Sequence, residues 1–298
     1  MKISALHRFF FCAFVATALS LVGHAQTQAG QIVIAKVEGQ VMKVAKDGTS
    51  IPLKNGDKVT ETDTVTTAKE SGVVLVFMNG SSVKLGADSR LAIDEFKMDP
   101  LAEDLDVSKL KAEPSISKTS LNLSYGEMVG DVKKLNTAAG SSYNIKTPVG
   151  AAGIRGTIYR IVFKPDANGK AFFQVQTAEG SVVFSSASAG AGAANAAAQE
   201  VPVDAGKEIS ITLDIPDTPG QAFVMPQLVS TELPPETVAT ISTAVQVIAE
   251  VVQQTVIPPT PPSTPTPTPP STPTPPPEPV QIQVTQPNLT PGAGKPSS

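Results

Sequence analysis

The sequence predicts an all-β domain over residues 31–215, built as a β-sandwich or a β-solenoid and followed by one helix and a proline-rich tail. Short apolar and β-branched runs recur about every ten residues, which is typical of all-β domains. Turn-forming residues separate these runs. Residues 258–279 alternate proline with threonine and serine, a composition that excludes helix and sheet.

The first residues have the pattern of a secretory signal peptide. Lys2 and Arg8 form a basic end, residues 9–22 are almost wholly apolar, and small residues precede a cleavage point near Ala25. The apolar run is shorter than the roughly 20 residues that cross a bilayer. We therefore expect residues 1–25 to be removed and the exported chain to be periplasmic or secreted.

Composition excludes several classes of function. The single cysteine, Cys12, and both histidines, His7 and His24, lie in the expected signal peptide, so the remaining chain lacks the usual nucleophile–base pairs and zinc ligands. The formal net charge is −4, which disfavours nucleic acid as a partner. We predict no enzymatic activity, no catalytic residue, no metal site and no cofactor.

The expected strands follow from the apolar runs in chain order. They are residues 32–34, 41–44, 73–77, 83–85, 121–123, 143–146, 157–163, 171–177, 181–184 and 209–213. Asn55-Gly56-Asp57 and Asn79-Gly80 tolerate positive φ and suit tight reversals. Residues 100–117 are more charged and lack alternation, which favours a long loop or a short helix over one edge.

A weak internal repeat is visible within the β-domain. Residues 38–41 and 51–57 (EGQV and IPLKNGD) resemble residues 179–182 and 201–207 (EGSV and VPVDAGK). The copies differ mainly by an insert, residues 187–198, which is nearly all alanine, glycine and serine. The repeat indicates two related β layers or coils, with chance similarity as the alternative.

Residues 234–257 predict one helix, because Pro234-Pro235-Glu236 suits a first turn and proline returns at 258. Apolar residues three and four apart form one stripe: Val238, Ile241, Val245, Ile248 and Val252. We favour docking of this stripe onto the β-domain over self-association, because fewer than three heptads make a weak coiled coil. Residues 258–298 are expected to be disordered.

An ordered set of motifs runs through the β-domain. It comprises residues 38–41 (EGQV), 53–59 (LKNGDKV), 63–67 (DTVTT), 71–77 (SGVVLVF), 79–85 (NGSSVKL), 91–93 (LAI), 145–148 (IKTP) and 154–157 (IRGT). Together these motifs, over roughly Val37–Gly206, resemble the FecR family, whose type member is the iron-dicitrate sensor. The resemblance implies an extracytoplasmic all-β domain. In the type member this domain relays a signal from an outer-membrane receptor to an inner-membrane anti-sigma factor.

The resemblance singles out Thr147, Pro148, Ile154, Arg155, Gly156 and Thr157 as a binding or structural motif. Arg155 is the strongest candidate, because it is the only charge between Lys146 and Arg160 and lies among glycines. We expect its guanidinium to hold a turn through Asp57 or Asp131, in preference to contacting a ligand, and Thr157 to support the same turn.

Three functions of different classes remain open. The leading one is an exported, non-enzymatic binding or signal-relay module that contacts an envelope protein or polysaccharide. The alternative is a structural envelope scaffold or adhesin-like protein that self-associates through residues 238–252. The least favoured is a polysaccharide-active enzyme, in which Glu127 or Asp131 would lie opposite the acidic run at residues 103–106.

Overall fold

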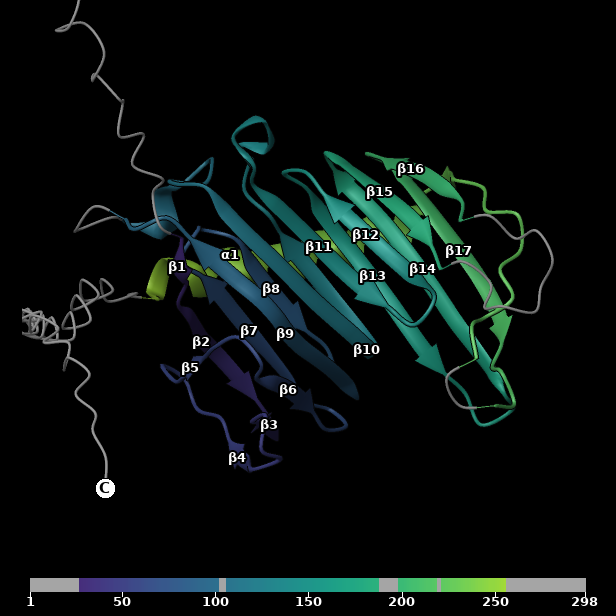
Figure 1. The fold of residues 1–298 in the computed structure, drawn as a ribbon, viewed down its shortest axis with the longest axis horizontal. Coiled ribbons are helices and arrows are strands. Elements are labelled where there is room, and N and C mark those ends of the chain that lie inside the picture. The colour runs from purple at the N-terminus through teal and green to yellow at the C-terminus, as the bar shows by residue number, and fades with distance from the viewer. Residues whose placement is uncertain (1–26, 102–105, 188–197, 219–220, 256–298) are drawn as a thin grey trace, which may run out of the picture. The chain divides into compact units, whose positions relative to one another are not determined.

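The computed structural model describes residues 27–101, 106–187, 198–218 and 221–255 (Figure 1). Its strands form one continuous mixed sheet that folds into two facing layers, here called layer A and layer B. The prediction of an all-β domain followed by one helix is therefore confirmed. The expected signal peptide and proline-rich tail lie outside the described residues.

Each layer is ordered along the chain, with the first strands at one end and the last strands at the other. Layer A consists of β4 (Ser50–Pro52), β3 (Val41–Val44), β6 (Thr64–Thr67), β9 (Ser89–Met98), the first part of β10 (Ser117–Asp131), β11 (Ser142–Thr147), β12 (Gly150–Ile154), β15 (Ser181–Ser186) and β16 (Glu200–Asp204), with β1 (Gln28–Ala29) beside the end of β9. Layer B consists of β5 (Lys58–Val59), β2 (Ile32–Glu38), β7 (Gly72–Phe77), β8 (Ser82–Leu85), the second part of β10, β13 (Ile158–Pro165), β14 (Lys170–Glu179), β17 (Lys207–Asp214) and β18 (Thr231–Glu232). Between β9 and β10 the described residues form a loop with one 3-10 turn, η1 (Val107–Lys109), and a second such turn, η2 (Thr137–Ala139), follows β10.

Strand pairing supports the sandwich form over the solenoid form. Among the described strands, the β10–β11 ladder alone is parallel, whereas the coils of a parallel β-helix stack parallel strands. Aromatic pairs also join the two layers across a shared core. These pairs are Phe77–Phe96, Tyr143–Tyr159 and Phe173–Phe184, with ring centroids 5.1, 6.5 and 5.0 Å apart.

The long strand β10 connects the two layers. Its residues up to Tyr125 pair with β9 and β11 in layer A, and residues 126–131 pair with β8 and β13 in layer B. The change of layer falls at Gly126, whose φ is +107°. A Cβ there would lie 2.5 Å from the Cα of Ser89, so both the backbone angle and the space require glycine.

The internal repeat is confirmed as two four-strand units at opposite ends of the layers (Figure 1). One unit is β2–β5 and the other is β14–β17. In each unit the first and last strands pair in layer B, and the two middle strands pair in layer A. The sequence similarity between residues 38–57 and 179–207 therefore reflects a shared path of the chain.

Both edge strands of layer A carry the equivalent proline of this repeat, Pro52 in β4 and Pro202 in β16. The Leu53 N–H donates to the Val41 carbonyl, so the nitrogen of the preceding Pro52 faces away from β3. The same alternation along β15–β16 turns the Pro202 nitrogen away from β15. Proline thus removes an outward N–H from each edge, which disfavours addition of a further strand.

The helix α1 (Pro235–Gln254) packs on the outer face of layer B. It is three residues shorter at its C-terminal end than the expected 234–257. Ile241 and Ile248 are each 1% exposed and share one buried apolar cluster with Val74 and Val76 of β7, so the preference for docking is confirmed. Strand β7 is buried throughout because its two faces meet layer A and α1, which explains its unbroken apolar sequence GVVLVF.

No helix in the described part of the chain is both long and apolar enough to cross a membrane.

Candidate functional site

The predicted Ile154–Thr157 motif forms the crossing from β12 in layer A to β13 in layer B. Ile154 is buried in the core, and Thr157 is 1% exposed. The backbone of Thr157 exchanges two 3.0 Å hydrogen bonds with Val132, and its Oγ1 donates to the Ser181 carbonyl at 3.0 Å. The expected support of this turn by Thr157 is confirmed.

The turn between β14 and β15, at Gly180, packs closely against this turn and also fixes it. A Cβ on Gly180, where φ is +81°, would lie 2.5 Å from the carbonyl oxygen of Gly156. Gly156 itself has φ +63° and faces the backbone of Lys134. The turn is therefore held by backbone contacts and by Thr157, with no contribution required from a charged side chain.

The expected intramolecular partner of Arg155 is wrong. Asp131 pairs with Lys133 at 2.7 Å, and Asp57 accepts a 2.8 Å hydrogen bond from the Lys54 N–H. Arg155 is exposed and has no hydrogen bond or ion pair to any residue that the structure describes. The prediction failed because Asp131, although opposite Ile158 and close to this turn, is paired with Lys133, and Asp57 lies in the distant turn before β5. The crossing presents Arg155 to solvent.

The other half of the hallmark lies at the opposite end of β12. Thr147 and Pro148 form the β11–β12 hairpin turn, where the Thr147 Oγ1 donates to the Gly150 carbonyl at 2.9 Å. Five strand residues, about 17 Å of extended chain, separate this turn from Arg155. The structure therefore does not bring the two motifs together as one site.

The predicted turn residues have structural roles. Asn55 accepts a hydrogen bond from the Val37 N–H at 2.8 Å, and Gly56 has φ +88°. Asn79 is fully buried, and its Nδ2 donates to the Ser117 Oγ at 3.1 Å, which ties the β7–β8 hairpin to β10. Gly80, with φ +86°, completes that hairpin.

A second surface, which sequence reasoning missed, lies on the outer face of layer B beside α1. Register places outward side chains of β10, β13, β14 and β17 in three rows, here called the open half of the face. The rows are Lys164–Phe172–Thr212, then Glu127–Val162–Gln174–Ser210, then Arg160–Gln176–Glu208. The covered half is the neighbouring surface beneath α1, formed by Val74, Val76 and Val129.

Hydrogen bonds connect the polar side chains of the open half across the strands. Arg160 Nε donates to Glu127 at 2.8 Å, and its NH1 donates to Gln174 at 3.2 Å and to Gln176 at 2.7 Å. Lys164 pairs with the second oxygen of Glu127 at 2.9 Å. The network fixes these side chains in place before any other molecule arrives.

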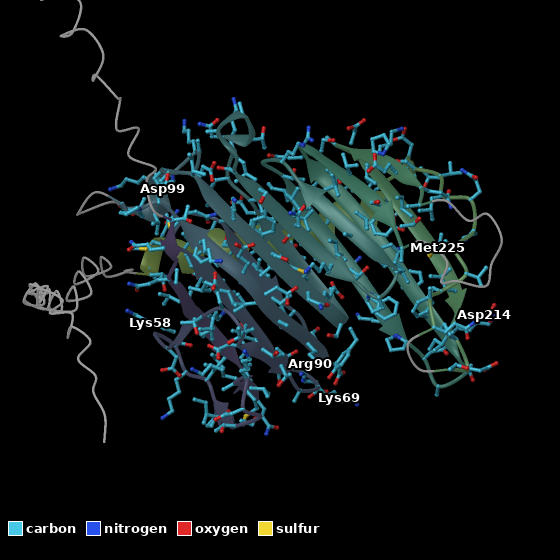
Figure 2. The ribbon with its side chains drawn as sticks, viewed as in Figure 1. Lys58, Lys69, Arg90, Asp99, Asp214 and Met225 are labelled. Atoms are coloured by element: carbon cyan, nitrogen blue, oxygen red, sulfur yellow. The ribbon has the colours of Figure 1, made fainter. Side chains whose placement is uncertain are left out.

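The hydrogen bonds then continue to β17. Gln176 donates to Glu208 at 2.6 Å, and Gln174 donates to Ser210 at 3.1 Å. The Lys170–Asp214 ion pair closes the end of the open half, and Asp214 is labelled there in Figure 2.

Glu127 stays ionised over the whole physiological pH range. Burial raises the pKa of its carboxyl, but the hydrogen bonds from Arg160 and Lys164 lower it further, and the resulting pKa is about 2. A carboxylate with this pKa accepts hydrogen bonds and does not donate a proton near neutral pH. Glu127 is therefore unsuited to the role of a general acid.

A groove of about 450 Å³ lies between α1 and the open half. Lys84, Gly86 and Glu127 line it on the sheet side, and Thr240 and Thr243 line it on the helix side. Both threonine hydroxyls donate to carbonyls of their own helix, at 2.9 and 3.0 Å. Each hydroxyl oxygen therefore keeps lone pairs that can accept a further hydrogen bond.

The acidic run considered for catalysis does not form a carboxylate pair with the open half in the described residues. Glu103 and Asp104 lie outside those residues, and Asp106 caps η1 through the Ser108 N–H. Asp131 is occupied by Lys133. Within the same described ranges, no three His, Cys, Asp or Glu side chains gather as metal ligands would.

Comparison with known proteins identifies the central part of this fold. Residues 63–183 match the family described as FecR protein, so the chain carries a FecR domain that runs from the start of β6 into β15. The match is narrower than the Val37–Gly206 span of the motif resemblance, and it contains the Arg155 turn, Glu127 and the β13–β14 hairpin. A search of curated proteins finds no match to this chain.

Two crystal structures of a protein from Parabacteroides distasonis ATCC 8503, described as a "putative anti-sigma factor", share limited similarity with the chain. Sequence identity is 10% in both, and the TM-scores are 0.37 for the 2.50 Å structure and 0.38 for the 1.65 Å structure. The similar region covers 59% of this chain and 62% of that protein.

Proposed function

We propose that the chain is an exported, non-enzymatic binding or signal-relay module of the cell envelope. The observation that carries this proposal is Arg155, an exposed cation without a described partner on a rigid turn inside the FecR domain. A fixed guanidinium offers a planar set of donors to a carboxylate or carbonyl of another molecule. We assign Arg155 to contact with an envelope protein.

Two further observations support this proposal. The amino-terminal pattern of a basic end, an apolar run and small residues is that of an export signal. The carboxylate at the centre of the open half, Glu127, is held ionised by two cations, which favours binding over acid catalysis. Docking of α1 on layer B buries Ile241, Ile248 and Val252 of the apolar stripe, so self-association through residues 238–252 is the less favoured proposal.

Affinity capture from a crosslinked cell envelope tests the function. The full chain is compared with Arg155→Ala and with Arg90→Ala, a control on β9 whose residue is labelled in Figure 2. We expect one defined protein partner to be captured by the full chain and by the Arg90 variant, and to be lost with Arg155→Ala. Capture of the chain's own copies alone, or equal capture by all three, would contradict the proposal.

A further inference from the structure

The open half of layer B presents a partly exposed aromatic ring. Phe172 is 40% exposed, whereas the next residue, Phe173, is fully buried against Phe184 in the core. Alternation along β14 sets this difference, because successive side chains point to opposite faces. An exposed phenyl ring beside ordered polar groups is a suitable platform for a flat apolar surface of another molecule.

Polar side chains flank this ring. Gln174 follows it on the same face of β14, and Lys164 lies directly opposite it on β13. The amide of Gln174 is held at both ends, by Arg160 and by Ser210. Such fixed side chains suit a ligand whose groups both donate and accept hydrogen bonds, as hydroxyls do.

The charges of the open half balance, which bears on the charge of its ligand. Arg160 and Lys164 are matched by Glu127 and Glu208 through ion pairs and hydrogen bonds. An anionic ligand would be expected to require uncompensated cations, and a cationic ligand uncompensated carboxylates. The three rows therefore favour a neutral ligand, and Lys84, which lines the groove without an ion pair to a described residue, is one cation outside this balance.

Backbone pairing disfavours a peptide that binds by strand addition. β10, β13, β14 and β17 each have a hydrogen-bonded neighbour on both sides in layer B, where β17 is followed by β18. Their backbone groups are therefore unavailable to an added strand. Contact with the open half has to be made through side chains.

We propose that the open half of layer B, with the adjoining groove beside α1, binds a neutral polyhydroxylated chain, namely a glycan strand. Phe172 stacks on the apolar C–H face of one sugar ring, and Gln174 and Glu127 bind its hydroxyls. The groove, with Thr240 and Thr243, receives the next part of the chain. This site is separate from the Arg155 turn, and it adds a ligand class that the FecR match does not provide.

Titration of the purified full chain with neutral oligosaccharides tests this inference. The probes are hexasaccharides of β-linked glucose, α-linked glucose and N-acetylglucosamine, with hexagalacturonate as an anionic probe and an extended neutral peptide as a further comparison. We expect saturable binding of at least one neutral hexasaccharide, measured by isothermal titration calorimetry. Neither the anionic probe nor the peptide should bind the same surface.

Two variants and a matched control locate the binding site. Phe172→Ala and Gln174→Ala should each weaken binding about tenfold, because each removes one stacking or hydrogen-bonding contact. Ile51→Ala is the control, since Ile51 on β4 is apolar and similarly exposed, at 45%, but lies in layer A. It should change the affinity less than about twofold.

Several outcomes would overturn the inference. They are no saturable binding of any neutral hexasaccharide at millimolar concentration, binding that both Phe172→Ala and Gln174→Ala leave unchanged, and preference for the anionic probe or the peptide. Unfolding curves for each variant separate a lost contact from a lost fold. Envelope capture through Arg155 is measured independently, so failure of glycan binding does not affect that test.

Discussion

The two halves of the outer face of layer B differ although the same sheet forms both. The covered half presents Val74, Val76 and Val129 to α1, and the open half presents Glu127, Arg160 and Gln174 to solvent. Strand β7 is apolar at every position, whereas β13 and β14 alternate apolar and polar residues. The comparison indicates that helix docking stabilises one half, while the other is ordered by its own hydrogen bonds. The open half is accessible around Phe172, whereas Gln176 and Glu208 are buried.

The largest expected effect comes from breaking the covered half. Ile248→Asp places a carboxylate where the helix is 1% exposed against layer B, and the free energy of unfolding should fall by more than about 4 kcal/mol. Urea unfolding measures this change. Val238→Asp is the control on the same helix, because Val238 is 41% exposed, and its effect should stay within about 0.5 kcal/mol. Equal effects would contradict docking of the stripe.

A smaller loss is expected when the network of the open half is broken. Arg160→Met keeps the length of the side chain but removes the donors to Glu127, Gln174 and Gln176, and it should cost about 2 kcal/mol. Lys164→Met removes a cation whose side chain is 49% exposed, and it should cost no more than about 1 kcal/mol. Chemical denaturation of both variants gives the comparison, and a larger loss for Lys164 would contradict it.

The open half should also make stability depend on pH in the acid range. The pKa of Glu127 is about 2 in the folded chain, against an ordinary value of 4.5. Its ionised form therefore stabilises the fold fully above pH 4.5, and this contribution is lost as the pH falls toward about 2. In the Glu127→Gln variant, the loss of stability between pH 4.5 and about 2 should be smaller by about 2 kcal/mol. Urea unfolding across that range measures the difference. Identical pH profiles for both proteins would show that Glu127 is not held by these ion pairs.

The smallest expected effect on stability is at the aromatic ring of the open half. Phe172→Ala should change the free energy of unfolding by no more than about 0.5 kcal/mol, because the ring is 40% exposed. The adjacent Phe173→Ala should cost about 3–5 kcal/mol, because it empties a core position between the layers. Thermal unfolding of the pair measures the contrast. A large loss for Phe172→Ala would mean that the ring serves the fold and not a ligand.

The sequence predicted strands well where apolar residues alternate or run together. Every expected run, from 32–34 to 209–213, lies within or overlaps a strand, and α1 differs from its expected bounds by a few residues. Strand β12 was missed because its sequence GAAGI has little β propensity, and it forms between β11 and β15, which both pair with it. The full length of β10 was missed because serine and asparagine occupy its solvent-facing positions.

The sites were harder to predict because they depend on which strands become neighbours. Arg160 and Glu127 are 33 residues apart, and they meet through the β10–β13 pairing. Part of the open half could have been inferred, since a hairpin turn at residues 166–169 with period-2 alternation places Lys164, Phe172 and Gln174 on one face. That Arg155 has no partner among the described residues could not be inferred without the positions of Asp57 and Asp131.

Thiol labelling provides the most direct test that the open half contacts another molecule while the covered half serves the fold. Cys12 is the single cysteine of the chain, so Thr212→Cys and Val238→Cys in a Cys12→Ser background are single reporters beside Phe172 and on α1. We expect an envelope fraction to slow maleimide labelling at position 212 several-fold, and to leave the rate at position 238 unchanged. Equal rates at position 212 with and without the envelope fraction would contradict the account.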